Sequence, residues 1–239
     1  MIDFEQLKGK TVAITGASRG IGKETASLLA GLGANLVLGA RGKDELNEAA
    51  SQMNKKTLAI PMDVTDEQSV LNFMNEGITR FGKIDALINS AGTGVFESVL
   101  AMSTEDFDRM IAVNLRGTFL TSKYFGQHMV ENHSGKMINI VSIAGTMALP
   151  GCGGYSASKF GVLGLSRVLQ AELRGKGIQV TSVLPGAVAT PFWDRMEQKP
   201  DISQMIPVQS LAKHIIYLLC QPEGAVVDET MIMPPLGIL

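Results

Sequence analysis

The sequence has few of the residues that build disulfide frameworks and metal sites. It contains two cysteines, Cys152 and Cys220, and three histidines, none of which shares a metal-ligand spacing with either cysteine. Thiols this few and this widely spaced are typical of reduced cytoplasmic chains, because disulfides persist mainly in oxidising compartments. We therefore expect a cytoplasmic protein and predict no metal site.

The chain also lacks an excess of basic residues. Lys and Arg number 21 against 23 Asp and Glu, a formal net charge of -2, which favours neither nucleic acid nor an anionic membrane as a partner. Apolar residues make up 45% of the chain and charged residues 18%, a composition typical of globular proteins rather than disordered ones. We expect no nucleic-acid partner, whereas a small bound anion is compatible with this charge balance.

No segment has the pattern of a signal peptide or of a lipid-exposed helix. The first residues, MIDFEQLKGK, place acids early and lack a basic stretch followed by an apolar one. The uncharged run 137–158 is long enough to span a bilayer, but Asn139, Pro150 and several glycines interrupt it. We interpret this run as buried protein interior and expect no membrane partner.

Short apolar runs alternate with longer segments of helical periodicity. The apolar runs predict strands covered on both faces, at 11–16, 34–40, 57–62, 84–89, 136–142, 178–185 and 225–233. The segments between them predict helices at 20–32, 43–53, 66–81, 104–132, 155–175 and 209–220. This alternation indicates an α/β fold, with a parallel sheet between two layers of helices. We expect a single domain over residues 1–239.

One long irregular segment interrupts this pattern. Residues 185–207 are rich in proline and contain no clear strand. A segment of this length is usually a functional lid, and a plain surface connection is the alternative. We predict a short lid region at about 186–207.

A glycine-rich motif, TGASRGIG at 15–22, lies between the first predicted strand and the first predicted helix. Gly16, Gly20 and Gly22 allow a tight turn and let a pyrophosphate approach the helix N-terminus, where free N–H groups and the helix dipole favour anions. Because the motif lies at the first strand–helix junction of an alternating chain, it predicts a dinucleotide site.

The end of the second predicted strand indicates which dinucleotide binds. NAD sites usually have an acid here that binds the ribose 2′-OH, but this strand ends LVLGAR and no acid occurs before Asp44. Arg41 follows the strand and Arg19 lies inside the glycine loop, and a guanidinium matches the oxygens of a 2′-phosphate. Solvated surface arginines are the alternative. We predict NADP(H), with Lys43 as a further nearby charge.

Candidate catalytic residues follow the later strands. Ser142 ends the fifth predicted strand, and Tyr155 and Lys159 lie four residues apart in the helix after it. Residues at this spacing share one helix face, so both side chains can point into the same cleft. A nearby ammonium favours the phenolate, so we expect Lys159 to lower the pKa of Tyr155 from about 10. The alternative is a buried tyrosine beside an exposed lysine.

Taken together, these residues resemble the short-chain dehydrogenases and reductases, from Lys10 to about Leu219. The resemblance implies a Rossmann-type doubly wound sheet of about seven parallel strands with helices on both faces. The motifs that carry it, in the family's order and spacing, are TGxxxGxG, the NSAG turn at 89–92, Asn114 in IAVNLRGTF, Ser142, YxxxK at 155–159 and PGAVAT at 185–190.

The resemblance implies a role for each catalytic candidate. Tyr155 would exchange a proton with the substrate oxygen, Ser142 would bind that oxygen, and Lys159 would hold the nicotinamide ribose. Asn114 would position a water behind Lys159. The implied dinucleotide contacts are Gly16, Ser18, Arg19, Gly20, Ile21, Gly22, Arg41, Asp63, Val64, Asn89, Ala91, Gly92, Tyr155 and Lys159, with Pro185, Gly186, Val188 and Thr190 beside the nicotinamide.

The implied function is an NADP(H)-dependent oxidoreductase that moves hydride between the nicotinamide and a carbonyl or secondary alcohol, either a 3-oxoacyl reductase or a general ketone or aldehyde reductase. The alternative is a catalytically silent NADP(H)-binding sensor or scaffold, against which the retained Tyr155 and Lys159 argue. A sugar-nucleotide epimerase would need a larger substrate domain after Pro185.

Two features depart from the family's pattern. Ser90 stands where a second asparagine is common, and the chain finishes MIMPPLGIL without a glycine-rich turn. The short lid and tail favour an open site that accepts a bulky or carrier-bound carbonyl. Candidates for its lining are Phe96, Met147, Leu149, Cys152, Phe192, Trp193 and Met196. In the family that the chain resembles, the long helices at 104–132 and 155–175 commonly form a dimer interface, so the resemblance implies a homodimer or homotetramer.

Overall fold

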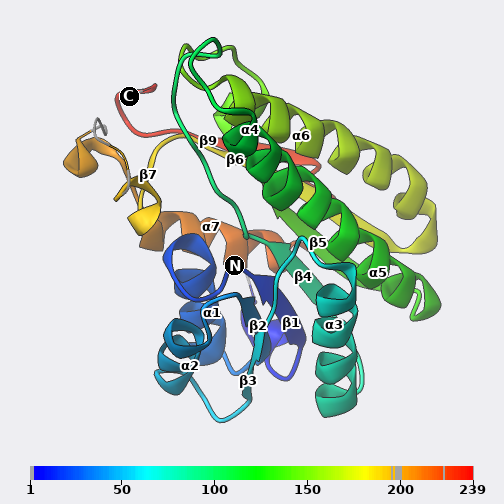
Figure 1. Cartoon of the computed structure of the whole chain (residues 1–239). Coiled ribbons are helices and arrows are strands. Elements are labelled where there is room, and N and C mark those ends of the chain that lie inside the picture. The colour runs from blue at the N-terminus through cyan, green and yellow to red at the C-terminus, as the bar shows by residue number, and fades with distance from the viewer. Residues whose placement is uncertain (1–2, 195, 197–200, 223, 239) are drawn as a thin grey trace.

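Seven parallel strands form the central sheet of the computed structural model, which describes residues 3–194, 196, 201–222 and 224–238. The strand order is β3-β2-β1-β4-β5-β6-β9 (Figure 1). The prediction of about seven parallel strands is confirmed. In chain order the strands are β1 Thr11–Thr15, β2 Asn35–Ala40, β3 Thr57–Pro61, β4 Ala86–Asn89, β5 Gly135–Ile140, β6 Ile178–Pro185 and β9 Glu229–Ile232.

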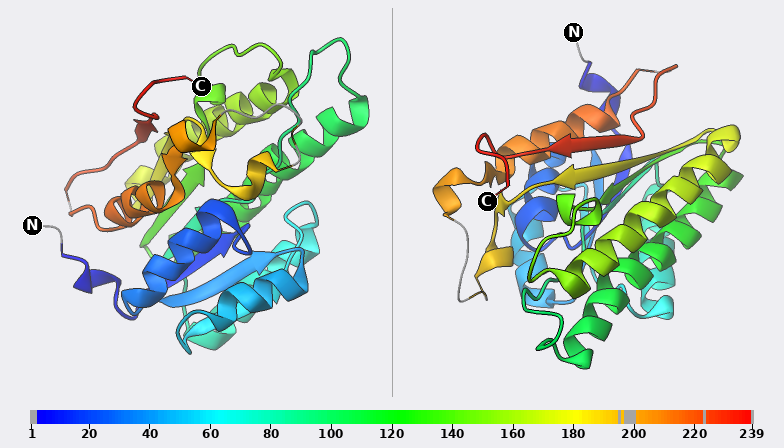
Figure 2. Two further views of the ribbon diagram at one scale, coloured as in Figure 1. Left: turned by 90° about the vertical axis from the view of Figure 1, so that its left-hand side faces the viewer. Right: turned by 90° about the horizontal axis from the view of Figure 1, so that it is seen from above.

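Helices cover both faces of the sheet, which explains why its central strands are almost continuously apolar. Leu29 and Ile215 belong to the core on one face, and Phe73 and Phe125 to the core on the other. Figures 1 and 2 show the two helical layers with the sheet between them. The first layer contains α1 Gly20–Gly31, α2 Lys43–Ser51 and α7 Val208–Leu219; the second contains α3 Glu67–Phe81, α5 Gly117–Glu131 and α6 Gly153–Leu173.

The strand order reverses beside β1, and this reversal positions the site. Thr15 at the end of β1 is in register with Gly39 of β2 on one side and Asn89 of β4 on the other. After β1 the chain adds β2 and then β3 on one side of β1. Helix α3 then leads back to β4, which lies on the other side of β1 and is followed there by β5, β6 and β9. In such sheets the connections diverge at the carboxyl ends of the strands and leave a crevice there.

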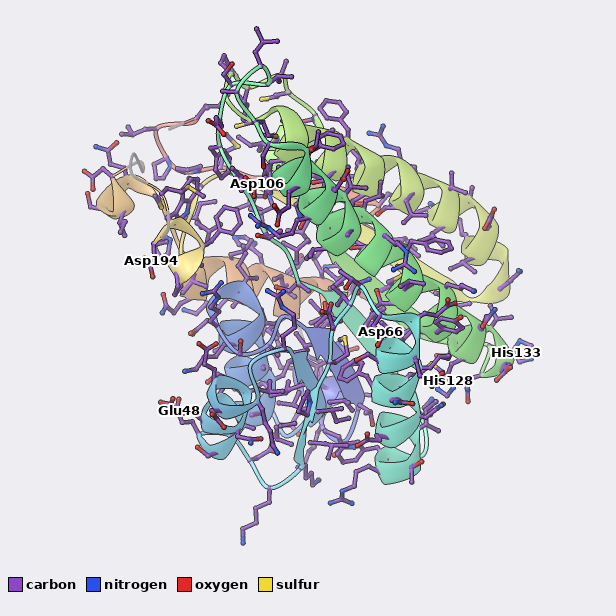
Figure 3. All side chains as sticks on the ribbon, viewed as in Figure 1. Glu48, Asp66, Asp106, His128, His133 and Asp194 are labelled. Atoms are coloured by element: carbon purple, nitrogen blue, oxygen red, sulfur yellow. The ribbon has the colours of Figure 1, made fainter. Side chains whose placement is uncertain are left out.

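Helix α1 begins differently from α3 and α4. Asp66 lies at the N-terminal end of α3 (Figure 3), where its Oδ1 accepts a hydrogen bond from the Gln68 amide at 2.9 Å. Ser103 caps α4, Thr104–Met110, in the same way. The residue before α1 is Arg19, which makes no side-chain cap. The first N–H groups of α1 are therefore left available to another acceptor.

The long helix predicted at 104–132 contains a π-helical segment. Helix α4 runs into π-helix at Ile111–Arg116, which continues directly into α5. Such a turn holds one more residue between hydrogen-bonded groups than an α-helical turn and often occurs at functional sites. Asn114 lies within it, so the interruption coincides with a predicted catalytic residue.

The predicted lid contains two short strands that the sequence pattern did not indicate. Val188–Ala189 (β7) pairs in parallel with Ile206–Pro207 (β8), so the two ends of the lid are joined at its base. A 3-10 turn at Pro191–Trp193 follows β7. Residues 195 and 197–200 of the predicted lid lie outside the described residues.

The prediction that the uncharged run 137–158 is buried interior is only partly right: residues 137–145 are buried, but Thr146, Ala148 and Pro150 are exposed. The run continues β5, forms a 3-10 turn at Ile143–Gly145 and begins α6, which starts at Gly153 rather than at the predicted residue 155. Within the part of the chain that the structure describes, no helix is both long enough and apolar enough to cross a membrane.

Candidate active site

A cavity of about 540 Å³ lies at the carboxyl ends of the central strands. Most of the predicted site residues line it, from the glycine loop at one end to Tyr155 at the other. These residues are Gly16, Ser18, Arg19, Gly20, Ile21, Arg41, Asp63, Val64, Ala91, Gly92, Ser142, Tyr155, Lys159, Pro185, Gly186, Val188 and Thr190. Gly22, Asn89 and Asn114 are not among its lining residues.

The glycine loop is packed so closely that side chains would not fit at two positions. Gly16 has a φ of +67°, and a Cβ atom on it would lie 2.7 Å from the Cα atom of Ala91. A Cβ atom on Gly22 would lie 2.5 Å from the carbonyl oxygen of Gly16. Gly22 therefore supports the loop from behind instead of facing the cavity, while Gly16 allows β1 and the turn after β4 to approach.

Two exposed arginines line the same end of the cavity. The guanidinium groups of Arg19 and Arg41 have no hydrogen-bond or ion-pair partner among the described residues. Lys43 does not line the cavity, whereas Glu45, which the sequence analysis did not single out, does. The charges that face this end are therefore mixed, with the two arginines nearer to the glycine loop and the end of β2.

Asn89 lies under the cavity in a buried network of polar side chains. Its Nδ2 donates to the Asn139 Oδ1 at 2.9 Å, and its Oδ1 accepts from the Thr121 Oγ1 at 2.7 Å. Ser122 completes its contacts at 3.3 Å. The side chain predicted to touch the dinucleotide is thus used to join β4, β5 and α5, which a single sequence does not reveal.

Tyr155 and Lys159 lie on one face of α6, as their spacing predicts, and the Lys159 Nζ is 5.7 Å from the centroid of the tyrosine ring. Burial raises the pKa of Tyr155 to about 12, and the Ser142 hydroxyl partly opposes this rise. The expected lowering by Lys159 is therefore not observed. Sequence spacing indicates that the two groups are neighbours but says nothing of how deeply they are buried.

Lys159 is itself buried, with 6% of its surface exposed. Its ammonium donates a hydrogen bond to the Ile140 carbonyl at 2.8 Å, while burial lowers its pKa to about 8. A buried cation without a carboxylate partner is costly, so the fold holds this group at the price of some stability.

Ser142 occupies the turn between β5 and α6. Its Oγ accepts a hydrogen bond from the Ala144 amide at 3.1 Å, and the side chain is buried at the cavity wall. With its oxygen occupied as an acceptor, the hydroxyl hydrogen can be donated to an oxygen in the cavity.

These features have counterparts in known proteins. The family model for short chain dehydrogenase matches residues 10–201. The chain belongs to the short-chain dehydrogenase family. An uncharacterized oxidoreductase of Staphylococcus aureus strain N315 is 34% identical to it over 229 residues, which are 95% of this chain and 98% of that protein.

Two solved structures resemble this short-chain dehydrogenase over nearly its full length. A short-chain type dehydrogenase/reductase from Mycobacterium marinum has a TM-score of 0.90 and 28% sequence identity, covering 97% of each chain. An alcohol dehydrogenase from the archaeon Thermococcus sibiricus, complexed with 5-hydroxy-NADP, has a TM-score of 0.87 and 32% identity, covering 95% of this chain and 97% of that one.

The short-chain dehydrogenase described here is an oxidoreductase of a family that binds a nicotinamide cofactor, and its cavity fits such a group. The uncapped N-terminus of α1 offers N–H groups to a pyrophosphate. Gly16 and Gly20, both at positive φ, bring backbone rather than side chain to the cavity. Tyr155 and Lys159 line the opposite end, where chemistry on a nicotinamide would occur.

Asn114 holds two parts of this short-chain dehydrogenase together. Its Nδ2 donates to the Thr93 carbonyl at 2.8 Å and to the Ser158 Oγ at 2.9 Å, and its Oδ1 accepts from the Thr93 amide at 2.8 Å. It thereby joins the loop after β4 to α6, which carries Tyr155 and Lys159. The predicted role in holding a water stays a prediction; the observed bonds tie Asn114 to both segments.

The far end of the cavity is apolar. The predicted substrate-side residues that line it are Phe96, Leu149, Cys152, Phe192, Trp193 and Met196. Met147 does not line it, whereas Thr93 and Ile238 do and were missed by the sequence analysis. Thr93 directly follows the glycine of the NSAG turn, a signal that was available. Ile238 comes from the C-terminal segment, which packs against Gly186 through Pro234 and lies near the lid in Figure 2.

Proposed function

We propose that this protein is an NADP(H)-dependent oxidoreductase that interconverts a ketone or aldehyde and the corresponding alcohol. One observation carries the proposal: Tyr155, Ser142 and Lys159 meet in the same cavity that receives the uncapped N-terminus of α1. A sensor without catalysis would have no need to keep a buried lysine beside a half-buried phenol, because burial of the cation lowers stability.

The chain's own residues would bind the cofactor, orient the substrate and move one proton. When bound, the cofactor would supply the hydride that reduces the carbonyl carbon. The raised pKa of Tyr155 keeps its phenol protonated at neutral pH, so it can donate a proton to the carbonyl oxygen. Ser142 would donate a hydrogen bond to the same oxygen as negative charge develops on it.

Lys159 would assist Tyr155 after the proton has left. Its ammonium lies 5.7 Å from the centroid of the phenol ring. A positive charge at this distance would stabilise the phenolate that Tyr155 becomes when it gives up its proton. Asn114 would keep Lys159 and Tyr155 in place through its bonds to Thr93 and Ser158. Proximity and orientation of these groups would supply much of the rate enhancement.

Preference for NADP(H) over NAD(H) is supported by Arg19 and Arg41. Both guanidinium groups line the cavity without a partner among the described residues, and such groups bind a 2′-phosphate well. Glu45 lines the same region and would repel a phosphate, so the preference depends on the two arginines outweighing one carboxylate. The Thermococcus sibiricus structure, complexed with 5-hydroxy-NADP, agrees with this choice.

The experiment that tests the function follows the loss of NADPH absorbance with a panel of 3-oxoacyl esters, diketones, quinones and aldehydes. We expect turnover of at least one class, and loss of roughly 100- to 10,000-fold in Tyr155→Phe. Tyr217→Phe, which changes an exposed tyrosine on α7, is the matched control. NADPH binding without turnover of any compound would instead favour the silent sensor.

We also propose that the protein forms a homodimer or homotetramer through α5 and α6. Phe119 on α5 and Phe160 and Val168 on α6 are large apolar side chains that are about half exposed. Light scattering at micromolar concentration should give a dimer or larger species, and Phe160→Glu should shift it toward the monomer. A wild-type monomer would contradict the assembly without touching the proposed chemistry.

A further inference from the structure

Three aromatic side chains, Phe96, Phe192 and Trp193, form a continuous surface beside Tyr155, here called the aromatic wall. The Phe96 centroid lies 5.3 Å from that of Tyr155, 6.1 Å from that of Phe192 and 5.7 Å from that of Trp193. The Phe192 and Trp193 centroids are 5.5 Å apart. Two segments far apart in sequence, the loop after β4 and the lid, thus build one surface next to the catalytic phenol.

Local contacts hold the aromatic wall in place. The Trp193 Nε1 donates to the Val188 carbonyl at 2.9 Å, which ties the indole to β7 at the base of the lid. A Cβ atom on Gly94 would lie 2.6 Å from the Phe192 Cζ and 3.1 Å from the Phe96 Cε2. The absence of a side chain at Gly94 therefore permits the two phenylalanines to come together. Asp194, labelled in Figure 3, ends the 3-10 turn of the lid that carries Phe192 and Trp193.

Among the described residues, Glu97 and Asp194 adjoin the aromatic wall in sequence, but neither lines the cavity. The charged residues that line the cavity are Arg19, Arg41, Glu45 and Asp63 at the cofactor end, and Lys159. The Lys159 ammonium donates to the Ile140 carbonyl and lies beside Tyr155, not among the three rings of the wall. A carboxylate or phosphate placed against the wall would lose its water without gaining a cation, which is strongly unfavourable.

Resting on the proposed reductase function, we propose that the substrate is a neutral carbonyl compound with a flat apolar ring, best an aromatic one, next to the carbonyl group. The ring packs on the aromatic wall, because aromatic faces and edges attract one another in offset and edge-to-face arrangements. The carbonyl then lies beside Tyr155, whose own ring contacts both Phe96 and Phe192. A negative charge on the substrate is disfavoured, because it would be buried at this end of the cavity.

Three 2-oxo compounds separate the effects of ring and charge. Ethyl benzoylformate carries a ring and no charge, ethyl pyruvate replaces the ring with a methyl group, and benzoylformate keeps the ring but adds a carboxylate. We expect kcat/KM for ethyl benzoylformate to exceed that for ethyl pyruvate by about tenfold. It should exceed that for benzoylformate by roughly 100-fold, because the carboxylate would lie on the other side of the carbonyl from the ring, beside Tyr155, where burial already disfavours a negative charge.

The variant Phe96→Leu tests whether the wall causes this preference. Leucine stays apolar but removes the flat face, so the ratio of kcat/KM between the ring ester and the methyl ester should fall to about two or less. Phe4→Leu, at an exposed phenylalanine near the N-terminus, is the control and should leave the ratio unchanged. An equal ratio in wild type and Phe96→Leu, or equal use of both esters by the wild type, overturns the proposal.

A binding measurement keeps this inference separate from the proposed chemistry. Trp193 is the chain's one tryptophan, so its fluorescence reports on the wall directly. In Tyr155→Phe with NADP⁺ bound, the ring ester should change this fluorescence at about tenfold lower concentration than ethyl pyruvate, with free tryptophan amide as the optical control. Ring-selective binding by Tyr155→Phe, together with no turnover by the wild type, would support the wall and refute the reductase. Turnover by the wild type without any ring preference would refute the wall and support the reductase.

Discussion

The two ends of the cavity are built by opposite means. The cofactor end is shaped by what is missing: side chains at Gly16 and Gly22, where a Cβ atom would overlap backbone, and a side-chain cap on α1. The chemical end is shaped by what is buried: a phenol and an ammonium whose pKa values are both shifted by burial. At the cofactor end there is no space for added side-chain atoms. At the chemical end the constraint is the cost of burying ionisable groups, not a lack of space.

This difference has a consequence for stability. Backbone that must turn tightly is stabilised by glycine, and any substitution there strains the folded state. A buried cation destabilises the folded state, and its removal relieves that cost. Substitutions at the two ends should therefore both impair function while moving the free energy of unfolding in opposite directions.

The largest expected effect is at Lys159. Lys159→Met should lower turnover roughly 1,000-fold by removing the charge beside Tyr155, yet raise the free energy of unfolding at pH 7 by about 1–2 kcal/mol. Because burial lowers the Lys159 pKa from 10.5 to about 8, the wild type gains stability as pH rises through that window.

The advantage of the methionine variant should accordingly shrink between pH 8 and the unfolded-state pKa of about 10.5. Urea unfolding at pH 7 and at the upper end of this window measures the change, with Lys213→Met on the exposed face of α7 as the control. A variant less stable than the wild type at pH 7 would break the proposed contrast between the two ends.

The next largest effect is expected at Gly16. Gly16→Ala should cost about 3 kcal/mol of stability, from the positive φ of 67° and the 2.7 Å approach to Ala91 together. Gly9→Ala is the control, because Gly9 has a similar φ of +77° but no atom within 4 Å of the added Cβ. The difference between the two unfolding free energies isolates the close approach, and equal costs would show that the loop has room to relax.

A smaller effect is expected at Asn89, which supports the cavity from below without lining it. Asn89→Ala should lower the free energy of unfolding by about 2 kcal/mol, because Thr121 and Asn139 lose buried partners. The KM for NADPH should change less than about threefold, since Asn89 does not line the cavity. A large rise in the KM for NADPH with little loss of stability would instead support the direct contact between Asn89 and the cofactor that the sequence predicts.

The smallest effect is expected at the exposed cations. Arg41→Ala should weaken NADPH binding about tenfold through loss of one charged hydrogen bond, and leave NADH nearly unchanged. Lys43→Ala is the control, because Lys43 does not line the cavity. Titration of each variant with both cofactors measures the change, and an equal loss for NADH would remove the basis for the proposed NADP(H) preference.

The sequence predicts the parts of this molecule that depend on local pattern. Continuous apolar runs indicated the buried strands, and the glycine spacing indicated the loop that packs on Ala91. Contacts between distant segments were not predictable in this way. The partners of Asn89 and Asn114 lie on other elements, and Ile238 reaches the cavity from the other end of the chain.

The error on Tyr155 has the same origin. The spacing to Lys159 correctly indicated that the two side chains are neighbours, and charge alone would then lower the tyrosine's pKa. Burial, which depends on everything packed around α6, has the opposite sign and prevails. Spacing along one helix thus predicts which groups meet, while their protonation depends on the rest of the fold.

The π-helical segment Ile111–Arg116 contains one residue more than an uninterrupted α-helix would need between α4 and α5. Because a π turn holds one residue more than an α turn, deleting one residue beside Asn114 would let α4 and α5 join as an ordinary helix with their outer faces kept in phase. Each residue turns a helix by roughly 100°, so the same deletion would swing the amide away from Thr93 and Ser158. We therefore expect such a deletion to disturb the hydrogen bonds of Asn114 more than the outer packing of α4 and α5.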